Sequence, residues 1–204
     1  MGVNVLKHFP GWPAAAILFM LFGCEATPDI PVNTGSTDPG TSVTFKGSRH
    51  TLLGDPIRIG ETLPSVQLTE PEGMTSVDLS KETGFVLFLS IVPSLDTKVC
   101  EAQTHRLGEE GDELPETVRR VTISRDTPFA QKRFADESGL TDIRYLSDYK
   151  RGDFGRAMGL LVEDLMLLAR SVVIVDQTGV VRYIQVVPEL TELPDMQRAF
   201  RKAK

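Results

Sequence analysis

The sequence is poor in the features on which several classes of protein depend. It has only two cysteines, and neither His50 nor His105 has a cysteine or histidine at a metal-ligand spacing, which argues against zinc. It contains no Gly-rich phosphate loop and no internal repeat. Lys and Arg number 22 against 28 Asp and Glu, and they are scattered, which argues against nucleic-acid binding. We therefore expect no metal, no cofactor and no nucleic-acid partner.

The chain also lacks an apolar run that is long enough to cross a membrane. Its best candidate, residues 14–22, is shorter than the ~20 residues that a spanning helix needs, and with Lys7 before it this run predicts a secretory signal peptide over residues 1–23. The segment Leu21-Phe22-Gly23-Cys24 resembles a bacterial lipobox, although Phe22 is bulkier than the usual residue. The resemblance implies that Cys24 is lipidated in an exported, membrane-anchored protein facing the periplasm or cell surface. An ordinary cleaved signal and an uncleaved anchor are the alternatives.

The residues after Cys24 have almost no apolar content. Residues 25–42 are rich in Pro, Gly, Ser, Thr and Asp, and such a composition cannot bury enough surface to become ordered. We therefore predict a lipidated flexible tether over residues 24–42 and one compact domain over residues 43–204. The acidic domain offers no basic patch to anionic lipids, so the lipid itself would supply the membrane affinity.

Apolar runs and alternation predict an α/β domain with helices on both faces of a sheet. Phe85–Val92 is a continuous apolar run, as expected for a strand that is buried on both faces. Thr127 is placed to cap a helix that has Pro128 at its first position. The expected strands are 43–45 with 51–53, 66–68 with 76–79, 85–92, 118–123, 145–146, and 172–175 with 180–187. The expected helices are 100–110, 127–135, 153–158 and 193–204.

The segment that directly follows the buried run carries the chemistry. It reads Pro93-Ser94-Leu95-Asp96-Thr97-Lys98-Val99-Cys100, and the helix predicted after it places Cys100 in a first turn. There the helix dipole and free backbone N–H groups favour an anion, and such a site can lower a thiol pKa from about 8.5 to about 3.5–7.5. With Cys24 lipidated, Cys100 would be the only free thiol. The alternative is an inert cysteine that is packed as a small hydrophobic residue.

The pattern Pro93-x-x-x-Thr97-x-x-Cys100 resembles the active-site signature of peroxiredoxins. Four further segments are similar, in the same order, to the thiol peroxidase group of that superfamily. They are Val43–Gly47, Thr127–Phe134, Leu167–Arg170, and Val187–Thr191 followed by Pro194-Asp195. The resemblance implies a thioredoxin-like fold, in which helices flank a central mixed sheet and a β-hairpin stands at the N-terminus.

The same resemblance implies a role for each of four residues. Cys100 would attack the terminal oxygen of a hydroperoxide and become a sulfenic acid. The Thr97 hydroxyl would orient the thiolate and the peroxide, while Pro93 would shield the site from water. Arg170 would stabilise the thiolate and the charge that develops on the leaving oxygen. The alternative for Arg170 is a surface arginine that lies over apolar neighbours. Arg133 could equally be an exposed charge on a helix.

The sequence departs from the group at one position. Ala135 stands where the group typically has a second, resolving cysteine, so the usual two-cysteine cycle is unavailable, and Cys24 could resolve Cys100 across the tether only if it escapes lipidation. A one-cysteine cycle remains, in which an external thiol or a thioredoxin-like protein reduces the sulfenic acid. The resemblance further implies hydrogen peroxide and alkyl or lipid hydroperoxides as substrates, and pairing into homodimers. The alternative function is a redox sensor or thiol-binding module that does not turn over.

Overall fold

The structure is a computed structural model, and it describes residues 1–2 and 30–204. Apart from Met1 and Gly2, the predicted signal peptide lies outside the described residues, as do Cys24 and the start of the predicted tether. Within the described ranges, none of the helices combines the length and the apolar content that crossing a bilayer requires.

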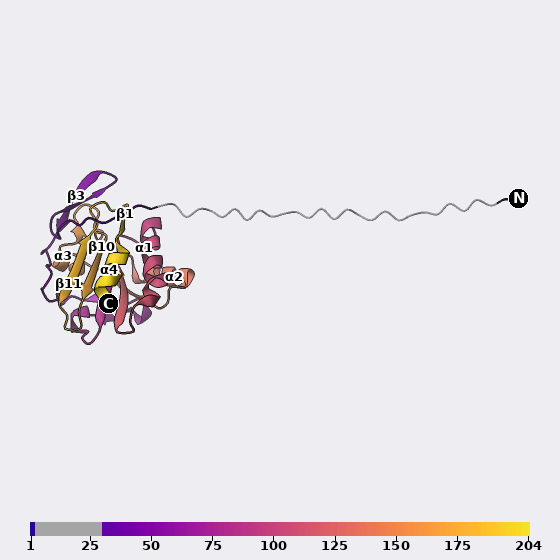
Figure 1. Cartoon of the computed structure of the whole chain (residues 1–204). Helices are drawn as coiled ribbons and strands as arrows, with labels where there is room; N and C mark the ends of the chain where they lie inside the picture. The colour runs from indigo at the N-terminus through magenta and orange to yellow at the C-terminus, as the bar shows by residue number, and fades with distance from the viewer. Residues whose placement is uncertain (3–29) are drawn as a thin grey trace.

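A seven-stranded mixed sheet forms the centre of the domain (Figure 1). Three parallel strands lie side by side in its middle: β6 (Val86–Ile91), β7 (Val118–Ser124) and β8 (Arg144–Ser147). The antiparallel hairpin of β10 (Ser171–Val175) and β11 (Val181–Val186) extends the sheet beyond β6, and the short pair β4 (Leu68–Thr69) and β5 (Ser76–Val77) extends it beyond β8. The predicted central mixed sheet is thus confirmed.

Helices cover both faces of this sheet because β6 is apolar on both of its faces. Phe88 points to the face that carries α1 (Lys98–Glu109) and α4 (Met196–Ala203), and its ring lies 5.2 Å from that of Phe200. Leu87 and Leu89 point to the opposite face, where they pack in one cluster with Phe154 of α3 (Asp153–Met158). α2 (Pro128–Ser138) packs against β8. Three short 3-10 helices occur at Glu72–Met74, Leu79–Lys81 and Gly111–Glu113.

The predicted start of α2 is confirmed in detail. Thr127 is the N-cap residue, and its hydroxyl oxygen accepts a hydrogen bond from the Ala130 amide at 3.3 Å. Pro128 follows at the first helical position, where its missing N–H has no cost. The helix runs on to Ser138 and ends at Gly139, whose φ of 70° favours glycine.

The last predicted helix begins later than expected. Leu193–Pro194 forms a short strand, β12, and α4 starts only after Asp195, whose carboxylate accepts a hydrogen bond from the Arg198 amide at 2.9 Å. β12 pairs in parallel with β1 (Val32–Asn33), and the Leu193 amide donates to the Pro31 carbonyl at 2.8 Å. The prediction of helix from residue 193 was wrong because this pairing with a distant segment cannot be read from local sequence.

The compact domain also begins earlier than residue 43, its predicted start. The segment that contains β1 is also joined to β11, because the Thr37 amide donates to the Val186 carbonyl at 3.0 Å. The Gln185 side chain donates to the carbonyls of Asn33 and Gly35. Residues 31–37 are held by hydrogen bonds rather than by apolar burial. Their polar composition therefore does not show where the tether ends and the domain begins.

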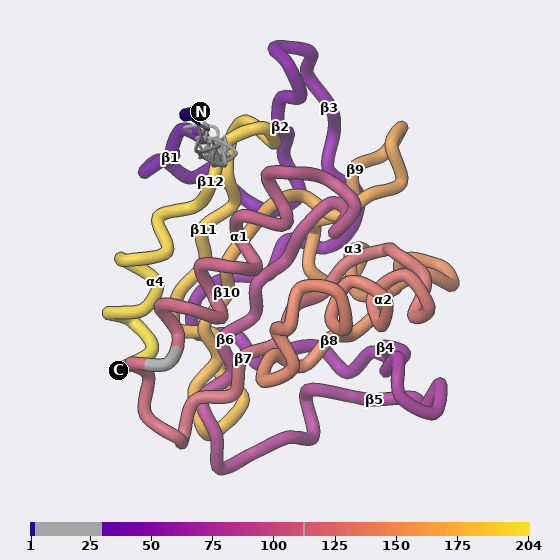
Figure 2. Tube along the Cα trace, turned by 90° about the vertical axis from the view of Figure 1, so that its right-hand side faces the viewer, coloured from indigo at the N-terminus to yellow at the C-terminus, as the bar shows by residue number. Residues whose placement is uncertain are grey.

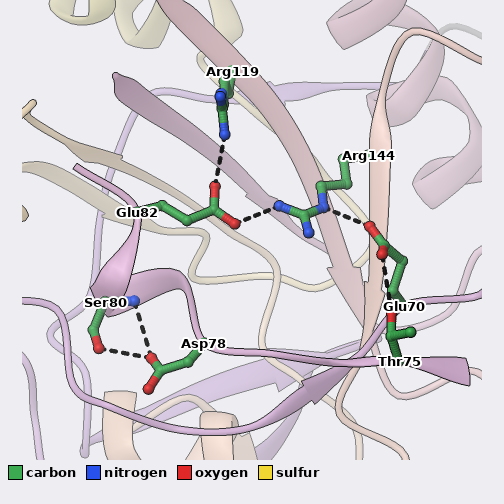
Figure 3. Close-up of polar contacts among 7 residues, drawn as sticks. All are labelled: Glu70, Thr75, Asp78, Ser80, Glu82, Arg119 and Arg144. Carbon is green, nitrogen blue, oxygen red and sulfur yellow. Dashed lines mark hydrogen bonds and ion pairs between the residues drawn. The ribbon is translucent and has the colours of Figure 1, made fainter. Parts of the chain in front are cut away.

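Arg144 ties the edge of the sheet to its centre (Figure 3). Its guanidinium donates to Glu70 beside β4 at 2.7 Å and to Glu82 before β6 at 2.5 Å, and Glu82 also accepts from Arg119 at 3.1 Å. Glu82, Arg119 and Arg144 all lie at or before the N-terminal ends of the parallel strands. Cys100 comes after the C-terminal end of β6, so this charged network is separate from the predicted site.

The predicted N-terminal hairpin is confirmed as β2 (Ser42–Phe45) and β3 (Ser48–Leu53). β3 also pairs with β9 (Leu161–Val162), so that the three strands form a second small sheet. The hairpin stands at the opposite end of the molecule from β4 and β5 (Figure 2). The Glu189 carboxylate holds its tip, because it accepts hydrogen bonds from the amides of Lys46 and Gly47 at 3.0 and 3.2 Å and from the Thr44 hydroxyl at 2.8 Å.

This anchor predicts a dependence of stability on pH. Partial burial, the strongest single influence, raises the pKa of Glu189, but hydrogen bonds from the hairpin and from Thr191 together outweigh it and lower the pKa to about 2. Because the pKa lies below its ordinary value of 4.5, the stabilisation is complete above about pH 4.5 and is lost as the pH falls towards 2.

We therefore expect Glu189→Gln to lower the free energy of unfolding at neutral pH and to lower it less as the pH falls. Urea unfolding at a series of pH values, compared with wild type, measures the difference. Glu163→Gln is the matched control, since Glu163 is an exposed acid beside β3 and should leave the pH profile unchanged. A constant difference between Glu189→Gln and wild type down to about pH 2 would contradict the argument.

Candidate active site

Cys100 lies in the first turn of α1, as predicted. The backbone of Thr97 is extended, with φ −131° and ψ 141°, so the helix starts at Lys98, and its first hydrogen bond runs from the Glu101 amide to the Thr97 carbonyl at 2.9 Å. The Thr97 side chain makes no capping hydrogen bond. Amides of the first turn therefore have no partner within the helix, which favours an anion at this position.

The Cys100 side chain is completely buried, with 0% of its surface exposed. It packs in one cluster with Phe88, Val92 and Leu95, on the α1 face of the sheet. Such apolar surroundings alone would favour a neutral thiol, which is the inert alternative. The character of the site therefore depends on the polar groups that reach the sulfur.

Arg170 is the polar group that reaches it. Arg170 is only 2% exposed, and Nη2 of its guanidinium donates to Cys100 Sγ at 3.3 Å. Nε and Nη2 also donate to the Leu190 carbonyl, at 3.0 and 2.9 Å, and Nη1 donates to Gln103 Oε1 at 2.8 Å. The alternative of a surface arginine lying over apolar neighbours is therefore wrong.

In the part of the chain that the structure describes, no carboxylate forms an ion pair with Arg170, and its acceptors are a carbonyl, an amide oxygen and a thiol. A buried charge without an opposite charge is costly. Cys100 Sγ is the atom at hydrogen-bond distance from this charge that can carry a negative charge during a reaction.

Gln103 is a member of the site that the sequence analysis missed. It is fully buried one turn after Cys100 on the same face of α1, and its amide nitrogen donates to Ser90 Oγ of β6 at 2.9 Å. This bond turns the amide oxygen towards Arg170. The spacing of three residues from Cys100 on one helix face was a signal that could have identified it.

The structure places the other two predicted residues in the loop between β6 and α1. Pro93 is buried directly after the strand. Thr97 is exposed, and its hydroxyl donates to the Ser94 carbonyl at 3.0 Å, with no hydrogen bond to Cys100. The structure therefore brings Cys100 and Arg170 together and leaves the Thr97 hydroxyl on the loop.

Asp126, which sequence reasoning also missed, holds this loop in place. Its carboxylate accepts hydrogen bonds from the Ser94 hydroxyl and the Leu95 amide, each at 2.7 Å. Asp126 follows β7, the neighbour of β6, so adjacent parallel strands bring it to the same edge of the sheet. Asp126 could have been identified from the sequence as an acidic residue at the C-terminal end of the strand next to β6.

The weaker candidates lie away from the sulfur. The exposed guanidinium of Arg133 is 4.0 Å from both Asp96 and Glu137. His105 pairs with Glu109 on the outside of α1. Ala135, at the position of the absent resolving cysteine, packs against the same apolar cluster as Cys100. Cys100 is the only cysteine among the described residues.

The role of Gln103 predicts a specific effect of its loss. Gln103→Leu removes an acceptor from a buried charge and should lower the free energy of unfolding by about 1–3 kcal/mol. It should also slow the reaction of Cys100 with iodoacetamide, because Arg170 loses one of its restraints. Gln131→Leu is the matched control, since Gln131 is equally buried but bonds to Ser124 and Leu146 instead. Alkylation of Cys100 that is slowed equally in both variants would contradict the proposed role of Gln103 in holding Arg170.

Comparisons with known proteins identify the family to which the chain belongs. Residues 58–200 match the family model described as redoxin. The thiol peroxidase of Halalkalibacterium halodurans is 40% identical over 163 residues, covering 80% of this chain and 97% of the relative. The thiol peroxidase of Bacillus subtilis is 38% identical over 162 residues, covering 79% and 96%.

Solved structures show the same relationship. The crystal structure of a peroxiredoxin-like protein from Aquifex aeolicus has a TM-score of 0.75 at 32% identity, over 80% of this chain and 95% of that one. The thiol peroxidase from Chromobacterium violaceum has a TM-score of 0.67 at 21% identity, over 77% and 91%, and supports the thioredoxin-like fold alone. The residue range that matches the family model includes both Cys100 and Arg170. The chain therefore belongs to the peroxiredoxin superfamily, as an oxidoreductase of its thiol peroxidase group.

Proposed function

We propose that this protein reduces hydrogen peroxide and organic hydroperoxides by a one-cysteine cycle at Cys100. The thiolate attacks the terminal peroxide oxygen, a sulfur–oxygen bond forms, and the O–O bond breaks. Sulfur is oxidised by two electrons to a sulfenic acid, and the leaving oxygen takes up a proton as water or an alcohol. One external thiol then forms a mixed disulfide and releases water, and a second thiol restores Cys100.

The observation that carries this proposal is the hydrogen bond from Arg170 to Cys100, since no carboxylate among the described residues forms an ion pair with this guanidinium. The guanidinium can stabilise the negative charge first on sulfur and then on the leaving oxygen. Because Arg170 is held by Leu190 and Gln103 before any peroxide arrives, little reorganisation is needed during the reaction.

Pro93 and Thr97 act on the incoming peroxide in this proposal. Buried Pro93 keeps water from the thiol, and the Thr97 oxygen, which donates to Ser94, keeps lone pairs with which to accept a hydrogen bond from a peroxide. The sulfur itself is closed off from solvent. The peroxide therefore needs a small outward movement of the loop to reach it.

The reductant in the proposed cycle is an external thiol or a thioredoxin-like protein, because Ala135 cannot resolve the sulfenic acid. The absent resolver also favours the second candidate function, a redox sensor or thiol-binding module. An enzyme would consume many equivalents of peroxide with a suitable thiol, whereas a sensor would stop after one. Pairing into homodimers belongs to the same proposal and rests on the family relationship.

The first chemical step gives a direct test. We expect rapid mixing of the full chain with hydrogen peroxide to add one oxygen at Cys100, identified by mass spectrometry of the trapped product. Arg170→Met should slow this oxidation by about 10²-fold or more, because it removes a preorganised donor at the reacting atoms. Thr97→Val should also slow it.

Arg133→Met is the matched control for charge, since this exposed arginine lies near the loop without contacting the sulfur. Its oxidation rate should equal that of wild type. Oxidation of the wild-type chain no faster than that of a free thiol would contradict the peroxidase proposal and favour the binding module.

Export and anchoring through Cys24 form the remaining part of the proposal and rest on the lipobox-like segment. We expect the protein, expressed in a bacterium with a lipoprotein pathway, to sediment with the membrane fraction, and Cys24→Ala to move it to the soluble fraction. Cys100→Ala is the control, since it also removes a cysteine but should stay with the membrane. Sedimentation that is equal for wild type and Cys24→Ala would contradict lipid anchoring.

A further inference from the structure

The loop between β11 and β12 connects the N-terminal hairpin to the active site. Besides its three bonds to the hairpin, the Glu189 carboxylate accepts hydrogen bonds from the Thr191 amide at 3.1 Å and the Thr191 hydroxyl at 2.8 Å. The Leu190 amide donates to the Thr44 carbonyl of β2 at 2.8 Å. The Leu190 carbonyl is the oxygen that accepts twice from Arg170.

The orientation of that carbonyl depends on Glu189. The Leu190 C=O and the Thr191 N–H belong to one planar peptide unit and point in opposite directions. One side of this unit is held by Glu189 Oε1 and the other accepts the guanidinium. Rotation of the unit would break the bond to Glu189 and turn the oxygen away from Arg170.

We propose that Glu189 is a positioning residue for the peroxidase reaction, acting on Arg170 through the 190–191 peptide unit. The hairpin that Glu189 also binds is thereby coupled to the active site. A carboxylate suits the position because all five of its partners are donors. A glutamine there would turn an NH2 group towards at least one of them.

The inference rests on the proposed function, and its test uses the full chain carrying Cys24→Ser, in which Cys100 is the only thiol. Two quantities are measured: the rate of Cys100 oxidation by hydrogen peroxide, and the pH profile of Cys100 alkylation by iodoacetamide. Glu189→Gln should slow oxidation by roughly tenfold, as expected for weakening one charge-assisted hydrogen bond, and should move the alkylation profile to higher pH. Glu163→Gln, with the same loss of charge, should change neither.

Glu189→Asp separates the contacts of Glu189 with the hairpin from its contacts with Thr191. An aspartate readily bonds the amide two residues later, so it can still hold the Thr191 N–H, but it is too short to reach the hairpin as well. We expect it to restore most of the oxidation rate and the wild-type alkylation profile, although the hairpin is held less firmly. It also serves as the test variant if Glu189→Gln does not fold.

A double-mutant cycle with Arg170→Met decides whether Glu189 acts through the guanidinium. If it does, adding Glu189→Gln to Arg170→Met causes no further loss of oxidation rate or shift of the alkylation profile. Additive effects, or an unchanged alkylation profile in Glu189→Gln, would overturn the inference. If wild type reacts with peroxide no faster than a free thiol, the proposed function fails, and the alkylation profiles alone still decide the role of Glu189.

Discussion

The rest of the site depends on keeping the positive charge of Arg170 buried beside a sulfur atom. Burying a guanidinium requires acceptors for its N–H groups, and the chain supplies them from separate elements: the Leu190 carbonyl from the loop after β11, and Gln103 and Cys100 from α1. Because Leu190 and Cys100 are also buried members of the hydrophobic clusters, the fold and the chemistry share their contacts. A substitution that loosens one of them affects stability and reactivity together.

The sequence predicted the parts of this protein whose causes are local. The buried strand at residues 85–92, the Thr127 cap and the position of Cys100 in a first helical turn all follow from neighbouring residues. Arg170 was placed by resemblance, because an arginine 70 residues from Cys100 has no local link to it. Gln103 and Asp126 left signals in the sequence, the helix spacing to Cys100 and the position after a neighbouring strand, whereas the role of Glu189 exists only once the loop after β11 meets the hairpin. The same reason explains why β1 was taken for tether.

The two ends of the sheet use charge in different ways. At the end that carries Glu70, Glu82 and Arg144, opposite charges pair with one another and fix the edge strands. At the end that carries Cys100, the partners of the Arg170 guanidinium among the described residues are a carbonyl, an amide oxygen and the thiol. In the first arrangement the charges already neutralise one another. The second lacks one negative charge, which an ionised sulfur can supply.

The pairing of β1 with β12 sets a limit on distance. Pro31 is bonded to Leu193, so the packed part of the chain starts only about seven residues after Cys24, a span of at most about 25 Å when fully extended. Leu193 in turn is close in sequence to Leu190, which holds Arg170. If Cys24 is lipidated as proposed, this short connection would hold the end of the domain that carries Cys100 near the bilayer surface.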